Sequence, residues 1–217
     1  MKAVLNVLAV ICAVTAICMD FFGQEQLYAI LKPLTTISIM MVLFIKGPPN
    51  LFRFKLLLVL AFLFCLIGDI FLLNDNYFVF GLGSFLIGHL CFASGFIQLE
   101  GFQTNRWIFL LLVSIGVGLF LWLRNDLGAL TGPVALYVLV IVFMAWQGAS
   151  LYFKRKQSSY ALIGIAVLLF MFSDTVIAIN KFKTAFEFAG AVILTTYWLS
   201  IALIANATYI ILDGYKK

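Results

Sequence analysis

Residues 62–73 read FLFCLIGDIFLL, and this stretch is apolar except for one carboxylate, Asp69. Residues 168–179 repeat the pattern as LLFMFSDTVIAI, around a second carboxylate, Asp174. The chain has only nine acidic residues, and these two lie inside long apolar runs. A charged side chain at the centre of a membrane helix costs about 2.5–3.5 kcal/mol, so such residues usually serve a function. We therefore interpret the rest of the chain as a frame that holds these two carboxylates in lipid.

The composition is that of a membrane protein. The 217 residues are 65% hydrophobic and 11% charged, whereas a soluble domain is about half apolar and one quarter charged. The net charge of +5 is spread over short loops without a long basic tract, which argues against a nucleic-acid partner. Membrane lipids are the expected surroundings. The length suits one domain, so we predict a single integral membrane domain over residues 1–217.

Eight apolar runs predict an all-α, polytopic bundle of transmembrane helices. Each run has 17–25 residues, the length that crosses a hydrocarbon core of about 30 Å. The first run could be mistaken for a signal peptide, but no small-x-small site closes it, so it is retained as a helix. Pro33 is expected in the first turn of the second helix, where proline is tolerated. The predicted helices are residues 3–19, 28–45, 52–73, 77–97, 107–123, 132–153, 160–180 and 188–212.

Eight spans place both termini on the same side of the membrane. Ten lysines and arginines fall on that side and four on the other, so the positive-inside rule predicts cytoplasmic termini. With this topology and a rise of about 1.5 Å per residue, Lys32, Asp69 and Asp174 lie at similar depth in the outer half of the bilayer. Tyr197 lies about 13 Å from the outer end of its helix, and His89 lies near the middle of the bilayer.

The order of the helices also predicts an internal repeat. Pro33 and Pro133 each begin an apolar helix, and Asp69 and Asp174 each lie near the outer end of the next one. Two parallel four-helix halves, related by an axis along the membrane normal, would place the two aspartates symmetrically. The alternative is that unrelated hydrophobic helices resemble one another.

The two carboxylates suit either acid–base chemistry or a structural role. Desolvation favours the protonated acid, whereas a neighbouring lysine favours the carboxylate. Two carboxylates near Lys32 could therefore divide into one acid and one base, the arrangement that hydrolyses acetal-like bonds. The structural alternative is a buried polar pair that fixes helix packing. Lys32 could instead extend to the membrane surface as an anchor or meet a lipid phosphate.

The remaining polar and small residues carry weaker signals. His89 is either a histidine buried in the bundle or a ligand, but a zinc site needs three or four ligands. One histidine and four scattered cysteines do not supply them, so no metal or cofactor is predicted. The cysteines Cys12, Cys18, Cys65 and Cys91 are interpreted as small core residues. Glycines in the fourth helix are expected to permit close helix packing: Gly81, Gly83, Gly88 and Gly95.

Taken in order, the polar motifs resemble those of the YhhN family over most of the chain. The most specific are Lys32-Pro33, the Gly68-Asp69 pair, the histidine of the fourth helix, and Ser173-Asp174 followed by Asn180-Lys181-Phe182. The motifs FGLGSFLIGH and GPVALYVLVIVFMAW lie between them, and Thr196-Tyr197 lies on the last helix. The sequence after Tyr197 lacks the glutamine that usually ends the family pattern there.

The resemblance implies a membrane-embedded, lysoplasmalogenase-like hydrolase. Such an enzyme cleaves the vinyl ether bond of a lysoplasmalogen, a lysophospholipid within the bilayer, to a fatty aldehyde and a glycerophospho-alcohol, and the reaction demands no cofactor. It implies that Asp69 and Asp174 share the acid and base roles, in an order that stays open. The supporting or substrate-binding residues that it implies are Lys32, His89, Tyr197, Ser173 and Asn180.

Two other classes of function fit the same residues. A small-solute or proton-coupled carrier also uses paired buried carboxylates and proline-containing helices. It would move a solute across sealed vesicles without changing it chemically. A non-catalytic lipid-binding or assembly protein would tolerate Asn or Ala at both aspartates with a change in stability only.

Overall fold

The computed structural model describes residues 2–44 and 47–214, and this part of the chain is entirely helical, without strands. The α-helices are α1 Lys2–Phe21, α2 Glu25–Met40, α3 Phe52–Phe71, α4 Phe78–Glu100, α5 Arg106–Leu123, α6 Thr131–Lys154, α7 Ser158–Phe182 and α8 Ala189–Gly214. Short 3-10 turns are η1 Met41–Leu43, η2 Pro49–Leu51, η3 Asp75–Tyr77 and η4 Gly128–Leu130. Eight segments of this described part are long and apolar enough to cross a membrane, which confirms the predicted all-α fold with eight spans.

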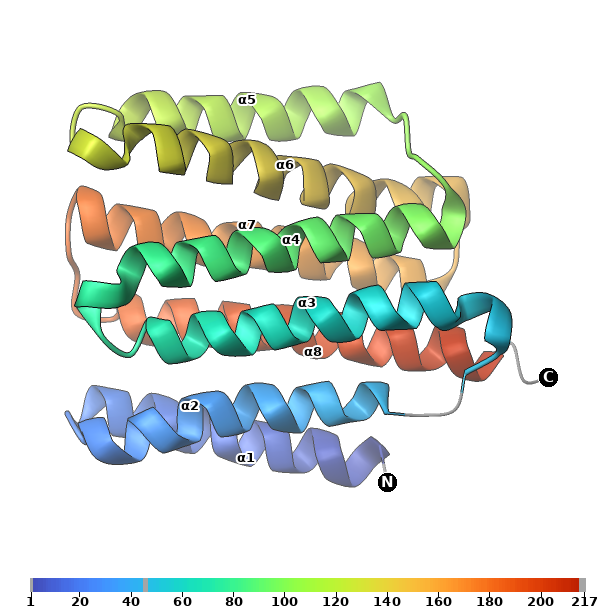
Figure 1. The fold of residues 1–217 in the computed structure, drawn as a ribbon, viewed down its shortest axis with the longest axis horizontal. Helices are drawn as coiled ribbons and strands as arrows, with labels where there is room; N and C mark the ends of the chain where they lie inside the picture. The colour runs from blue at the N-terminus through green and yellow to red at the C-terminus, as the bar shows by residue number, and fades with distance from the viewer. Residues whose placement is uncertain (1, 45–46, 215–217) are drawn as a thin grey trace.

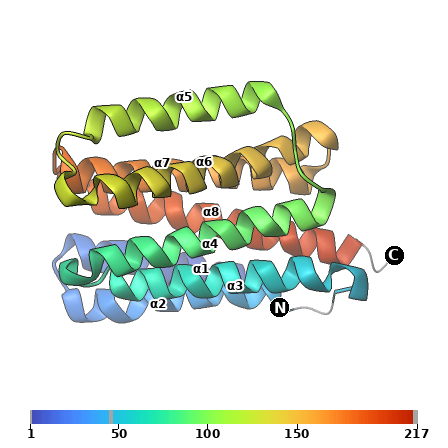
Figure 2. The same ribbon diagram turned by 45° about the horizontal axis from the view of Figure 1, so that its top comes forward.

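The helices lie side by side in one bundle. α1 begins and α8 ends at the same end of it (Figure 1). The strongest packing joins α3 to α4 and α7 to α8. α1 and α2 form one edge of the bundle (Figure 1), and α5 lies at the opposite edge beside α6 (Figure 2). We call the end that holds the α3–α4, α5–α6 and α7–α8 connections the outer end, following the predicted topology.

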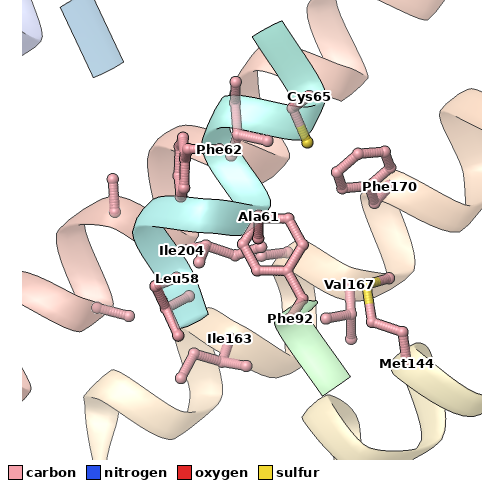
Figure 3. Close-up of a cluster of buried hydrophobic side chains, with 14 of the residues drawn as sticks. Leu58, Ala61, Phe62, Cys65, Phe92, Met144, Ile163, Val167, Phe170 and Ile204 are labelled. Carbon is pink, nitrogen blue, oxygen red and sulfur yellow. The ribbon is translucent and has the colours of Figure 1, made fainter. Parts of the chain in front are cut away.

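Aromatic and aliphatic side chains fill the centre of the bundle. Phe62 of α3 and Phe92 of α4 pack edge to face, with ring centroids 5.6 Å apart, and Phe170 of α7 packs against Phe92 (Figure 3). The edge helices are different, because Val4 on α1 and Trp107 on α5 are largely exposed. A bilayer would cover such apolar surface.

Glycines bring α4 close to α3, as the sequence predicts. A Cβ atom on Gly88 would lie 3.3 Å from the backbone oxygen of Ala61, and one on Gly95 would lie 2.5 Å from Leu58. Gly81 packs in the same way against the side chain of Leu72, the residue that follows α3. The prediction is wrong for Gly83, whose Cβ would meet nothing within 4 Å because this face of α4 points away from the other helices.

The second helix begins at Glu25, before the predicted start at residue 28. Gly23, with a φ of +66°, makes the turn that starts it, and an acidic residue is favourable in a first turn. Pro33 is therefore inside the helix, and the prediction that it occupies the first turn is wrong. The α-helix ends at Met40 and η1 continues to Leu43, whereas the predicted end at residue 45 lies outside the described residues.

All four cysteines are free thiols. Cys12 and Cys65 are buried as predicted, and Cys91 is partly buried. Cys18 is exposed, so its assignment to the core is wrong. The reason is that α1 lies at the edge of the bundle and buries only one face.

Candidate active site

Asp69 lies in the interior, with 1% of its surface exposed. Its Oδ2 atom accepts a hydrogen bond from the Thr36 hydroxyl of α2 at 2.6 Å and another from the Tyr197 hydroxyl of α8 at 2.9 Å. The indole of Trp198 donates to the Thr36 oxygen at 3.3 Å. A buried carboxylate needs such donors, because burial without partners costs several kcal/mol. Asp69 thus ties α3 to α2 and α8.

Lys32 approaches the Asp69 cluster from α2. It is buried in the bundle, with 5% of its surface exposed, so it does not extend to the surface as an anchor. It is within electrostatic range of Asp69 and Asp20, although no ion pair within 4 Å joins it to any residue the structure describes. Its Nζ atom lies 5.6 Å from the centre of the Tyr28 ring. Lys32 therefore places an amine within electrostatic range of a carboxylate that already has two donors.

Asp174 belongs to a second cluster. Its Oδ2 atom accepts a hydrogen bond from the Tyr137 hydroxyl of α6 at 2.5 Å, and it lies 3.7 Å from Nε2 of His89 on α4. Its side chain is 12% exposed, whereas the His89 side chain is fully buried. Among the described residues, neither ring nitrogen of His89 has a hydrogen-bond partner. The imidazole thus stands beside the carboxylate with free hydrogen-bonding capacity.

Aromatic rings separate the two clusters. Phe170 packs against His89, with centroids 4.6 Å apart, and against Tyr197, with centroids 5.4 Å apart. Phe85 packs against Tyr197 and Phe170. No hydrogen bond joins the two carboxylates within the described chain, but Cys65 is in electrostatic range of both. The two aspartates therefore form neighbouring sites rather than a directly paired dyad.

The partners of the two carboxylates come from corresponding helices. Asp69 on α3 has its hydrogen-bond donors on α2 and α8. Asp174 on α7 has its neighbours on α6 and α4. Adding four to the helix numbers converts α2 and α3 into α6 and α7. It also converts α8 into α4 when the numbering restarts at α1 after α8. This correspondence agrees with the predicted parallel repeat, in which both aspartates occupy equivalent places.

An apolar cavity opens beside Asp174, between α4, α5, α6 and α7, with about 750 Å³ of empty space, its open side included. Asp174 and Tyr137 line it, and Phe85 forms part of the same wall. Phe78 and Phe182 line it near the outer end of the bundle. Asp69 is not among the lining residues. Of the two carboxylates, Asp174 is thus the one that a molecule in this cavity would meet.

Ser173 and Asn180, which the family resemblance implied as supporting or substrate-binding residues, form hydrogen bonds between helices or within a loop. The Ser173 hydroxyl donates to the backbone oxygen of Ile193 at 3.0 Å, which joins α7 to α8. The Asn180 side chain accepts from the amide of Phe186 at 3.2 Å, in the loop between these helices. Neither residue lines the cavity.

Thr36 and Tyr137 are site residues that the sequence reasoning did not single out. Both follow a proline by about one turn, Pro33 on α2 and Pro133 on α6. The offsets are three and four residues, so a hydroxyl residue about one turn after a proline was a signal for both. Hydroxyl groups are also common inside apolar helices, however, and their spacing alone does not indicate which helix they face.

Residues 27–208 match the YhhN family, which covers the two clusters and the cavity. This chain belongs to the YhhN family. Among curated relatives, lysoplasmalogenase TMEM86A of Bos taurus is 33% identical over 148 residues, which is 65% of this chain and 60% of the relative. Lysoplasmalogenase TMEM86A of Homo sapiens is 32% identical over 149 residues, with the same coverage. Lysoplasmalogenase TMEM86B of Homo sapiens is 33% identical over 140 residues, 64% of this chain and 57% of the relative.

The match therefore spans less than two thirds of the length of these curated relatives. No solved structure matches the chain. The eight apolar helices and the YhhN match identify an integral, multi-pass membrane protein.

Proposed function

We propose that this protein is a membrane-embedded lysoplasmalogenase that cleaves the vinyl ether bond of a lysophospholipid. The observation that carries the proposal is the Asp174 carboxylate, held by Tyr137 in the wall of an apolar cavity. An apolar cavity suits the hydrocarbon chain of a lipid, and a carboxyl group beside it supplies a proton where water is scarce. The names of the curated relatives support the same reaction.

The reaction needs only proton transfers and water. An acid protonates the β carbon of the vinyl ether, and the positive charge that forms is shared between the α carbon and the ether oxygen. Water adds to the α carbon and loses a proton, which gives a hemiacetal. The hemiacetal then collapses to a fatty aldehyde and a glycerophospho-alcohol. One water is consumed, and no group is oxidised or reduced overall.

Asp174 is the acid in this proposal, because it is the carboxylate that lines the cavity. After it gives up the proton, its carboxylate can stabilise the cation and accept a proton from the attacking water. Tyr137 holds the reacting carboxyl in place through its hydrogen bond. His89, 3.7 Å away with free ring nitrogens, can hold that water or relay its proton.

Asp69 is the second carboxylate. The rings of Phe85 and Phe170 separate it from Asp174. From there its negative charge stabilises the cationic intermediate electrostatically. Lys32 and Tyr197 modulate that stabilisation, because both interact with the Asp69 carboxylate. We also propose that the termini are cytoplasmic and that the site lies in the outer half of the bilayer, as the charge distribution between the two sides predicts.

The test is a lipid hydrolysis assay on purified protein in detergent. The protein is given a lysoplasmalogen or its saturated alkyl-ether analogue, and release of fatty aldehyde is followed. We expect aldehyde from the vinyl ether only, and a loss of about a hundredfold or more in Asp174→Asn, since general acid–base catalysis contributes roughly 100- to 10,000-fold. Asp69→Asn should also lower the rate, by a smaller factor. Glu25→Gln, an exposed residue in the first turn of α2, is the matched control.

Full activity in Asp174→Asn would refute the assigned acid. Well-folded wild-type protein that releases no aldehyde would refute the hydrolase, and transport of a solute by the same protein in sealed vesicles would then favour a carrier.

A further inference from the structure

We infer that Lys181 and Lys183 form the binding site for the lipid phosphate, at the outer end of the cavity. The two lysines flank Phe182, the cavity-lining residue at the end of α7. The inference rests on the proposed lipid substrate, and it assigns the head group to residues that the catalytic proposal does not use.

Lys181 lies against a residue that lines the cavity, and Lys183 lies against the neighbour of another. The Nζ atom of Lys181 is 5.3 Å from the centre of the ring of Phe78, which lines the cavity on α4. The Nζ atom of Lys183 is 5.7 Å from the ring of Trp122, next to the lining residue Leu123 on α5. The two lysines thus lie beside two different helices, α4 and α5, at the outer end of the cavity.

Each lysine is held in place by an aspartate from a neighbouring connection. Lys181 forms an ion pair with Asp75 at 2.7 Å, and Lys183 forms one with Asp126 at 2.6 Å. The lysine side chains are 36% and 32% exposed, and Asp75 is 88% exposed. Exposed ion pairs contribute little net stability, so a phosphate can replace either carboxylate at small cost.

The spacing along α7 suits a lysophospholipid. Asp174 and Phe182 are eight residues apart, which is about 12 Å along a helix. In the lipid, seven bonds of about 1.5 Å each, or at most about 10 Å end to end, separate the phosphorus from the β carbon that Asp174 protonates. A phosphate therefore lies just short of the level of Phe182 when the β carbon is at the carboxyl group of Asp174. The flexible four-carbon stem of lysine allows Nζ to reach inward to that level.

The experiment measures equilibrium binding of a radiolabelled 1-alkyl lysophosphocholine, an ether lipid that the proposed reaction does not cleave, to purified protein in nanodiscs. A 1-alkylglycerol, which lacks the phosphate, is the comparison ligand. We expect the double variant Lys181→Met/Lys183→Met to bind the phospholipid about tenfold more weakly, because it loses charge-assisted contacts, and to bind the alkylglycerol as wild type does.

Two control variants separate phosphate binding from a structural role. Lys156→Met removes a lysine that also lies over aromatic rings but at the other end of the bundle, and it should change neither affinity. Asp75→Asn/Asp126→Asn breaks the same two ion pairs and keeps the lysines, so phospholipid binding should be retained or tightened.

Unchanged phospholipid affinity in the double lysine variant would overturn the inference, as would an equal loss in the double aspartate variant. Failure of wild-type protein to bind the ether phospholipid more tightly than the alkylglycerol would also overturn it. Lysine-dependent binding without aldehyde release from a vinyl ether would leave this site standing and refute the hydrolase instead.

Discussion

The bond between Tyr137 and Asp174 gives a sharp test of the assigned acid. Tyr137→Phe removes one hydroxyl and leaves the ring, which packs edge to face against His89 with centroids 5.4 Å apart. The hydroxyl donates to Asp174 at 2.5 Å, and it is the donor that fixes the carboxyl orientation toward the cavity.

The size of the effect follows from that single contact. A hydrogen bond to a charged group contributes about 1.5–3 kcal/mol. If the bond is needed as the proton leaves Asp174, its loss should lower kcat/KM by roughly 10- to 100-fold, since about 1.4 kcal/mol corresponds to a factor of ten. The bond also joins α6 to α7, so the thermal stability of the variant should fall as well.

The assay is aldehyde release from a lysoplasmalogen, with thermal unfolding in detergent measured on the same preparation. The matched control is Tyr152→Phe, a partly buried tyrosine on the same helix at the opposite end of the bundle, and it should keep wild-type activity. Wild-type kcat/KM in Tyr137→Phe would refute the reasoning that this contact prepares Asp174 for proton transfer, even if Asp174→Asn is inactive.

Two further predictions test the surroundings of the site. A Cβ on Gly68 would lie 2.6 Å from the ring of Phe85, which lines the cavity, so Gly68→Ala should destabilise the protein by about 1–3 kcal/mol and lower the rate of aldehyde release. Gly83→Ala, with open space around its Cβ, should do neither in thermal unfolding and activity assays. Ala178→Phe, one turn beyond the proposed acid on the cavity wall, should block binding of the alkyl-ether lipid without a comparable loss of thermal stability. Retained affinity would place the lipid elsewhere, and Ala3→Phe on the exposed side of α1 is the control.

Several properties of this protein follow from sequence alone. The eight apolar runs predict eight spans, because the length of a run must match the thickness of the hydrocarbon core. Asp69 and Asp174 stand out for an equally local reason, since an isolated carboxylate in such a run is costly. The family motifs led to the same two residues. Contact of α3 with Gly88 and Gly95 was also predictable, because small residues let helix backbones approach.

The tertiary structure decided how the polar residues are grouped. Position along a helix predicts the depth of a side chain in the membrane, and it placed Lys32 and Asp69, which are within electrostatic range of each other, at similar depth. Depth does not specify which neighbouring helix a side chain faces. For that reason the partners Thr36 and Tyr137 were missed.

The packing of the helices also separates the two carboxylates and gives them different surroundings. Aromatic rings stand between the clusters, and the apolar cavity reaches Asp174 without reaching Asp69. The sequence could not assign the acid, because both aspartates lie in similar apolar runs near the outer ends of corresponding helices. The difference between them arises only when α5 packs beside α6 and leaves space along α7, and that space depends on contacts between segments far apart in the chain.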